Sequence, residues 1–202
     1  AHACGLSDLD AVDELVATVE EELGGIDILV NNAGRSIRRP LEESLERWHD
    51  VERTMALNYY GPVRLIRGLA PGMLERRDGH IINVSTWGVK TESPPLFGVY
   101  NASKAAIHML TESIRLQLAD TNIEFKELIP PSVATDLLPG QRESSFAMPL
   151  DDFVSEVMSI LESQPEAKEI QVERVKYLRY GEARGDYDEV VDTVNTADPH
   201  GN

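Results

Sequence analysis

The chain has 202 residues, and its 35 Asp and Glu residues against 19 Lys and Arg residues leave a formal net charge of -16 at pH 7. This length suits one domain, and a content of 42% hydrophobic residues is enough for a substantial core. The excess of carboxylates would repel a phosphate backbone, which disfavours a nucleic-acid partner. No apolar run approaches the roughly 20 residues that cross a bilayer, so we expect no membrane insertion.

The cysteine and histidine content bears on compartment and metal binding. The single cysteine, Cys4, has no partner for an internal disulfide, so we expect a protein of the reducing cytoplasm. The histidines show no metal-ligand spacing with one another or with Cys4, so we expect no metal site. The five histidines are His2, His49, His80, His108 and His200.

The first predicted helix begins at Ser7, a residue type that often caps helices, and carries apolar side chains on one stripe as far as Leu23. Gly24 ends it. The next segment, residues 26–30, is short, β-branched and almost wholly apolar. We therefore expect a strand that is buried on both faces, as in a parallel sheet covered by helices.

Further helices and strands are predicted in alternation. A helical stretch with a break follows Pro40, and a long helix is expected at residues 100–119. Strands are expected at residues 80–84, 123–129 and 170–172. Residues 130–149 are irregular and suggest a lid, and a helix is predicted at residues 150–161.

This rhythm of strands and helices predicts a doubly wound α/β fold with a parallel, Rossmann-type sheet. We expect residues 1–180 to form this domain and the acidic residues 181–202 to be a disordered tail. In such sheets ligands bind at the carboxyl ends of the strands. The informative residues should therefore follow Val30, Val84 and Ile129.

Tyr100 and Lys104 stand one helical turn apart at the start of the long helix, so both side chains should lie on the same face. A free phenol with a pKa near 10 is a poor base at neutral pH. A nearby cation stabilises the phenolate, so we expect Lys104 to lower the pKa of Tyr100 and to bring proton exchange into range. By itself, such a pair is more often an ordinary solvated contact.

The surrounding motifs change that balance. The helix begins Tyr100-Asn101-Ala102-Ser103-Lys104, the preceding strand ends in Asn83-Val84-Ser85-Thr86, and an earlier strand ends in Asn31-Asn32-Ala33-Gly34. With these ordered motifs the chain resembles the short-chain dehydrogenase/reductase family, from about Cys4 to Asp136 and more weakly to Val172.

The resemblance implies a catalytic role for several residues. Tyr100 would be the proton donor and acceptor, Lys104 would lower its pKa and bind the nicotinamide ribose, and Asn58 would hold a water of the proton relay. A hydroxyl that orients the substrate carbonyl falls on Thr86 or on Ser85, and the alignment favours Thr86 narrowly.

The resemblance also implies NAD or NADP as cofactor. The strand-end motif would let the cofactor ribose approach a backbone without bulk, which assigns cofactor contacts to Asn31, Asn32, Ala33 and Gly34. The segment after the last long strand would grip the nicotinamide, which adds Val133 and Thr135. Pro131 replaces the glycine usual in that segment, and this removes an amide and stiffens the loop.

Family members begin with a strand and a glycine-rich turn that cradles the pyrophosphate, and this sequence contains neither. We therefore expect an N-terminally incomplete domain, a fragment of a longer reductase or a truncated gene model. As written, it should neither bind a dinucleotide tightly nor turn over. Loss of the first strands would also leave residues 26–30 as an exposed hydrophobic edge.

The function implied is an NAD(P)-dependent interconversion of an alcohol and a carbonyl, and the alternative is a non-catalytic cofactor sensor or interaction protein. Family members assemble through two long helices, here roughly residues 44–77 and 100–119, so a homodimer or homotetramer is expected of the full-length protein. Apolar residues on both sides of the site fit either an apolar substrate or ordinary core packing. They are Trp87, Leu96, Phe97, Leu137, Leu138, Phe146 and Met148.

Overall fold

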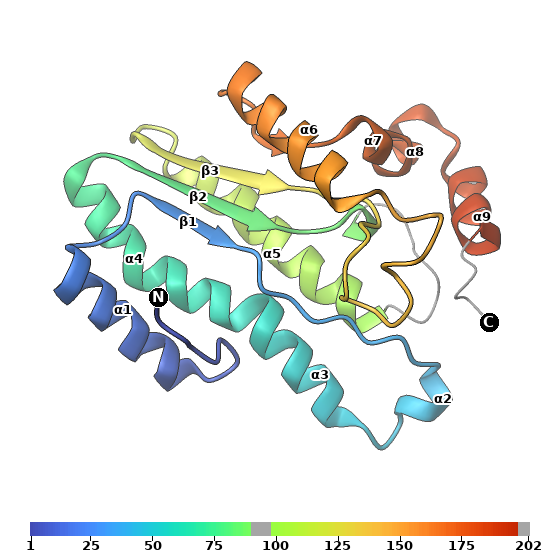
Figure 1. Cartoon of the computed structure of the whole chain (residues 1–202), viewed down its shortest axis with the longest axis horizontal. Helices are drawn as coiled ribbons and strands as arrows, with labels where there is room; N and C mark the ends of the chain where they lie inside the picture. Colours follow the sequence, from blue (N-terminus) through green and yellow to red (C-terminus); the bar gives the residue numbers. More distant parts are fainter. Residues whose placement is uncertain (90–97, 198–202) are drawn as a thin grey trace.

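The computed structural model describes residues 1–89 and 98–197, and in these residues it confirms the doubly wound α/β fold. Its centre is a parallel sheet with the strand order β1-β2-β3-β4 (Figure 1). The predicted strands are present with shifts of one or two residues at their ends. The strands are β1 (Ile28–Asn31), β2 (Gly79–Val84), β3 (Ile123–Leu128) and β4 (Glu169–Ile170).

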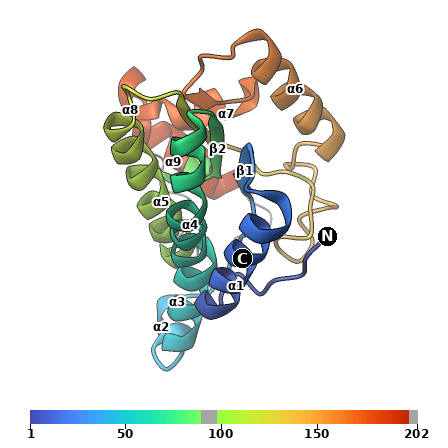
Figure 2. The ribbon, with the colours of Figure 1, turned by 90° about the vertical axis from the view of Figure 1, so that its left-hand side faces the viewer.

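Helices cover both faces of this sheet. Figure 2 shows α4 and α5 on one side of the strands and α6 on the other. None of the described helices combines the length and apolarity needed to cross a bilayer. The helices are α1 (Leu9–Leu23), α2 (Leu41–Ser44), α3 (Trp48–Met55), α4 (Gly61–Arg76), α5 (Gly98–Gln117), α6 (Leu150–Ser163), α7 (Glu173–Arg179), α8 (Gly181–Arg184) and α9 (Tyr187–Ala197), with a π-helical turn at Ala56–Tyr60 and a 3-10 turn at Trp87–Val89.

The sheet has one hydrophobic core on each face because side chains alternate along a strand. On β2, Ile81 faces the core shared with α1 and α4, where Val12 and Met73 are fully buried. The next residue, Ile82, packs on the opposite core with Val157 of α6. The two cores hold the sheet between its helices and leave the carboxyl ends of the strands for other contacts.

The first helix begins one residue later than the sequence predicts. Asp8, not Ser7, is the N-cap, and its carboxylate accepts hydrogen bonds from the amides of Asp10 and Ala11 at 3.1 and 3.3 Å. An aspartate cap also carries the charge that the positive end of the helix favours. At the other end, Gly24 adopts the left-handed conformation (φ 69°) that the predicted helix stop requires.

The prediction that the first strand is buried on both faces is wrong. Leu29 and Asn31 of β1 are buried, whereas Ile28 and Val30 are 59% and 51% exposed. The strand stands at the end of the sheet order, and within the described residues the face with Ile28 and Val30 stays open to solvent. The apolar composition therefore predicted correctly that these residues form a strand, but it did not predict that one face of the strand is exposed.

Residues 181–197 are ordered, whereas the sequence predicts disorder for residues 181–202. They form α8 and α9, and Val190 and Val194 are buried against Leu178, with Trp87 packed on the same cluster. Two valines one turn apart provide the apolar contact that anchors α9. Because acidic residues surround these valines in the sequence, the sequence pattern did not predict this short apolar face.

A row of polar residues crosses the sheet near the carboxyl ends of its strands. The register pairs Asn31 with Asn83, Asn83 with Glu127 and Glu127 with Glu169, so the row includes one residue from each strand. Within it, the Asn31 amide donates to Asn83 Oδ1, and the Asn83 amide donates to Thr111 Oγ1 on α5, both at 2.8 Å. This polar row therefore connects β1 and β2 to the helix above them.

We predict that Asn83→Ala lowers the free energy of unfolding by about 3 kcal/mol, because both the Asn31 amide and the Thr111 hydroxyl would lose a buried partner. Urea unfolding followed by circular dichroism measures the change. The exposed neighbour Asn32 supplies a matched control, since Asn32→Ala should change stability by less than about 0.5 kcal/mol. Equal stability of the two variants would contradict a structural role for the polar row.

Candidate active site

The predicted site residues come from four segments that meet at the carboxyl ends of β1, β2 and β3. Tyr100 and Lys104 lie in the first turns of α5, Thr86 follows β2, Asn58 belongs to the π-helical turn, and Gly34 follows β1. An added Cβ at Gly34 would lie 3.5 Å from Lys104 Nζ and 3.7 Å from Asn58 Oδ1. Glycine at this position therefore leaves the space beside the ammonium group free of a side chain.

Lys104 is a buried cation, not the solvated partner expected of an ordinary surface pair. Its residue is 4% exposed, and Nζ donates a hydrogen bond of 2.7 Å to the carbonyl oxygen of Val84 at the end of β2. Burial lowers the pKa of Lys104 to about 8, because removal from water disfavours the charged form. The side chain thus joins α5 to the end of β2, and burial of its charge has an electrostatic cost.

Tyr100 differs from its predicted behaviour. Burial raises the pKa of its phenol to about 12 and outweighs a hydrogen bond with Thr86 that acts in the opposite direction. The sequence predicts a pKa lowered by Lys104, but the ammonium is itself buried and donates to Val84. In this structure Tyr100 is therefore a neutral phenol at physiological pH.

Asn58 is buried at the π-helical turn and bonds to Arg35 and Ser103. Its Oδ1 accepts from the Arg35 amide at 2.8 Å, and its Nδ2 donates to the Arg35 carbonyl oxygen and to Ser103 Oγ, both at 2.9 Å. Ser103 in turn donates to the Tyr100 carbonyl oxygen at 2.7 Å. Asn58 thus connects the loop after β1 to the turn of α5 that carries Tyr100.

Ser103 contacts two of the predicted site residues but is not one of them. It stands beside Lys104 in the motif, and it accepts a hydrogen bond from Asn58, which lies 45 residues away in the sequence. Asn83 and Thr111, which hold the strand ends, were missed for the same reason. Ser103 and Thr111 are hydroxyl residues on the buried face of α5. Their position on that face of the predicted helix is the signal that could have identified both.

The two candidate hydroxyls at the end of β2 are separated by the structure. Thr86 is hydrogen bonded to the Tyr100 phenol. Ser85 is 1% exposed, and its amide continues the sheet by donating to the Leu128 carbonyl oxygen at 2.9 Å. Thr86 is therefore the hydroxyl that lies beside Tyr100, and the choice between Thr86 and Ser85 for orienting a substrate stays a prediction.

The residues of the strand-end motif, 31–34, differ in burial and in contacts. Asn31 is buried and engaged with Asn83, so its side chain stabilises the sheet. Asn32 and Ala33 are exposed, and Gly34 approaches Lys104. The last three residues are thus the part of the motif that a ligand could reach.

The segment with Val133 and Thr135 folds back on itself. Val133 is buried and forms a parallel bridge with Met148, and its carbonyl oxygen accepts from Gln141 Nε2 at 2.7 Å and from Thr135 Oγ1 at 3.4 Å. Gln141 was not predicted as part of the site. These contacts hold residues 130–149 in place at the end of β3 without regular secondary structure.

The apolar residues named around the site have different environments. Met148 and Trp87 pack into the cores, as ordinary core residues do, and Leu137 is 39% exposed. Phe146 lines a cavity of about 210 Å³ together with Pro131, Leu178 and Val194. Leu96 and Phe97 lie outside the described residues.

Comparison with known proteins adds a family and a fold. A family model described as short chain dehydrogenase matches residues 1–145. The chain is 64% identical over 135 residues to the fatty acyl-CoA reductase Rv0547c of Mycobacterium tuberculosis, a match that covers 67% of this chain and 46% of that protein. The chain therefore spans about half the length of this relative.

Two solved structures have the same architecture. A short-chain dehydrogenase from Streptomyces avermitilis gives a TM-score of 0.78 at 24% identity, over 98% of this chain and 79% of the other. A metagenomic short-chain oxidoreductase in complex with NADP gives a TM-score of 0.68 at 28% identity, over 85% and 72%. With the family match over most of its length, this chain belongs to the short-chain dehydrogenase family of oxidoreductases.

Proposed function

We propose that the chain carries the proton-transfer part of an NAD(P)-dependent oxidoreductase that interconverts a carbonyl and an alcohol. The observation that carries this proposal is the meeting of Tyr100, Thr86 and the buried Lys104 at the carboxyl ends of the strands. Burial of a cation one helical turn from a tyrosine whose pKa is raised by burial is a costly arrangement, and such costs are typical of functional sites.

The residues present fit the nicotinamide end of a dinucleotide. Gly34 leaves room beside Lys104 Nζ, and Lys104, Tyr100, Val133 and Thr135 are the residues that would hold the ribose and the carboxamide. A related solved structure is in complex with NADP, which supports the same cofactor class here. When bound, the cofactor would supply or accept the hydride. The 202 residues contain no glycine-rich turn, so part of this proposal is that they are inactive by themselves.

The protonation state of Tyr100 favours the reductive direction. Because its pKa is about 12, the phenol keeps its proton at neutral pH and can donate it to the oxygen of a bound carbonyl. If Thr86 turns its single hydroxyl proton from the phenol to the same oxygen, it polarises the carbonyl. Asn58 and Ser103 keep this turn of α5 in place.

We propose a substrate with an aliphatic acyl chain. The relative at 64% identity is named a fatty acyl-CoA reductase, and the cavity at Phe146, Leu178 and Val194 is lined mainly by apolar side chains. Pro131 and Ser132 also line this cavity and directly precede Val133, so the cavity adjoins the proposed cofactor segment. An apolar chain could occupy it while the carbonyl lies at Tyr100.

Assembly of the full-length protein as a dimer or tetramer remains part of the proposal. Met109 and Leu116 on the outer side of α5 are 60% and 78% exposed, and Trp48 at the start of α3 is 67% exposed. Exposed apolar side chains on the two long helical segments support contacts between copies. Size-exclusion chromatography with light scattering measures the state.

We predict that Tyr100→Phe in the full-length protein lowers kcat by a factor of about 10² to 10⁴, because the variant has no proton to donate to the carbonyl oxygen. The measurement is cofactor oxidation during carbonyl reduction, with both NADH and NADPH. Tyr60→Phe is the matched control, since Tyr60 is 48% exposed and should leave kcat unchanged.

The outcomes separate the two functions that the sequence leaves open. Unchanged turnover in Tyr100→Phe would refute the assigned proton transfer. Cofactor binding without turnover of any substrate in a broad panel would favour the sensor or interaction protein.

We predict that kcat/KM rises with the length of the acyl chain by about threefold to fourfold per methylene group until the cavity is filled, because each buried methylene contributes about 0.8 kcal/mol. A series of acyl substrates of increasing length checks this. A kcat/KM that does not depend on chain length would contradict the acyl-chain proposal and leave the proton-transfer proposal intact.

We predict that Lys104→Met abolishes turnover and raises the free energy of unfolding at pH 7 by about 1 to 3 kcal/mol. The pKa of Lys104 is about 8 in the folded chain and 10.5 ordinarily, so below pH 8 the folded chain bears the full cost of the buried charge. Between pH 8 and 10.5 only the unfolded chain keeps this proton, so wild-type stability increases with pH and the advantage of methionine disappears.

Urea unfolding at pH 7, 9 and 10.5 tests this window. The exposed Lys168 supplies the control, and Lys168→Met should change stability by less than about 0.5 kcal/mol at each pH. If Lys104→Met proves less stable than wild type at pH 7, the ammonium stabilises the fold and its burial needs no functional explanation.

A further inference from the structure

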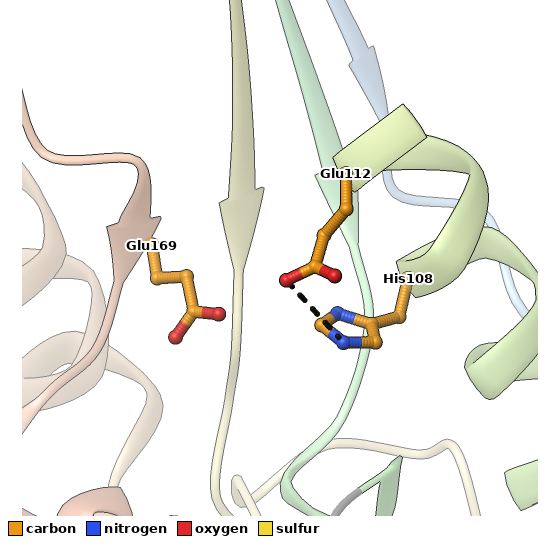
Figure 3. A group of neighbouring side chains, drawn as sticks. All are labelled: His108, Glu112 and Glu169. Carbon is orange, nitrogen blue, oxygen red and sulfur yellow. Dashed lines mark ion pairs between the residues drawn. The ribbon is translucent and has the colours of Figure 1, made fainter. Parts of the chain in front are cut away.

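A cluster of one histidine and two glutamates lies beneath α5, on the row of polar residues that crosses the sheet. His108 and Glu112 stand one turn apart on α5, and Glu169 belongs to β4. One ligand atom of each lies within 4.8 Å of the other two, and His108 Nε2 is 3.8 Å from Glu112 Oε1. Figure 3 shows the Glu112 carboxylate directed at the imidazole ring, with Glu169 facing both from the neighbouring strand.

His108 is oriented by a second, deeper carboxylate. Its side chain is 2% exposed, and Nδ1 lies 2.7 Å from Oε2 of Glu127, which is 1% exposed. Carboxylate oxygens accept hydrogen bonds, so the tautomer with the proton on Nδ1 fits this contact.

This tautomer leaves Nε2 with a lone pair aimed at the two outer carboxylates. Nε2 is fully buried and has no hydrogen-bond partner, a state that buried polar atoms seldom occupy without a reason. A carboxylate that holds one imidazole nitrogen while the other faces further acidic groups is the usual arrangement around a metal-bound histidine. The geometry therefore favours a bound ligand at Nε2.

Glu169 is held in place and open to a cavity. Arg179 Nη2 donates to Glu169 Oε1 at 2.8 Å, and Gln171 Nε2 donates to Oε2. Each carboxylate oxygen has a second lone pair, so these bonds orient Glu169 without exhausting it. The cavity of about 480 Å³ that Glu169 lines lies against α6 and α7 and includes neither His108 nor Glu112. The Glu112 side chain is 43% exposed, so an ion would enter from solvent beside Glu112.

The cluster carries an excess of negative charge. Three carboxylates, those of Glu112, Glu127 and Glu169, face one guanidinium, that of Arg179. A divalent cation bound at Nε2 would compensate this excess.

We propose that His108 Nε2, Glu112 and Glu169 bind a divalent transition-metal ion of the Zn²⁺ class. Bonds of about 2.1 Å to nitrogen and oxygen at a tetrahedral angle place ligand atoms roughly 3.4 Å apart, so small rotations of the glutamate side chains close the observed spacing. The imidazole nitrogen favours Zn²⁺ over Mg²⁺, which prefers oxygen ligands. The ion would fasten α5 to β4, with Glu127 of β3 orienting the His108 ring.

The test is titration of Zn²⁺ into the metal-depleted chain by isothermal calorimetry. We expect one ion per chain and at least tenfold weaker binding in Glu112→Gln, which removes one ligand at a half-exposed position. Glu162→Gln, at an exposed glutamate of α6, is the matched control and should bind as the wild type does. Substitution by Co²⁺ should give the visible absorption of a four-coordinate or five-coordinate site.

Two further measurements make the outcome independent of any one variant. Zn²⁺ should raise the Tm of the wild-type chain and Mg²⁺ should not, because binding to the folded state alone stabilises it. Glu169→Gln should weaken binding as Glu112→Gln does. A chain that takes up no Zn²⁺, or that binds it equally well in both variants, would overturn the proposal and leave His108 as part of an ion-pair network or the metal at a surface site.

Discussion

The structure depends on polar residues where the strands end. Asn31, Asn83, Glu127 and Glu169 occupy one row across the sheet, the first three of them are buried, and each of the inner two meets a side chain of α5. Buried polar groups tolerate few arrangements, because each unpaired donor or acceptor is costly. The row therefore specifies where α5 lies, and with it the positions of Tyr100 and Lys104.

Local patterns predicted much of the fold and the centre of the site. A run of β-branched residues, a glycine at a helix end and alternating strands and helices depend on neighbours in sequence, and they correctly predicted the parallel sheet and the left-handed Gly24. The one-turn spacing of Tyr100 and Lys104 was sufficient to predict that they share a region of α5. These features need no knowledge of distant segments.

Properties that depend on distant segments could not be predicted in the same way. The exposure of Ile28 depends on what covers β1, the order of residues 181–197 depends on Val190 meeting Leu178, and the pKa of Tyr100 depends on burial. The surroundings of His108 illustrate the same limit. The spacing of the histidines and Cys4 along the sequence does not indicate that Glu169 of β4 lies near His108 of α5. Burial and long-range pairing are properties of the folded chain.

The π-helical turn at Ala56–Tyr60 has a consequence for the whole helical segment that contains it. Such a turn accommodates one residue more than an α-helical turn, and each residue of an α-helix advances the direction of side chains by about 100°. Because the wide turn absorbs this additional residue, deleting one residue there would restore regular helical bonding and leave the phase of α3 against α4 nearly unchanged. The deletion would instead displace Asn58, whose amide contacts Arg35 and Ser103, so the irregularity serves these contacts.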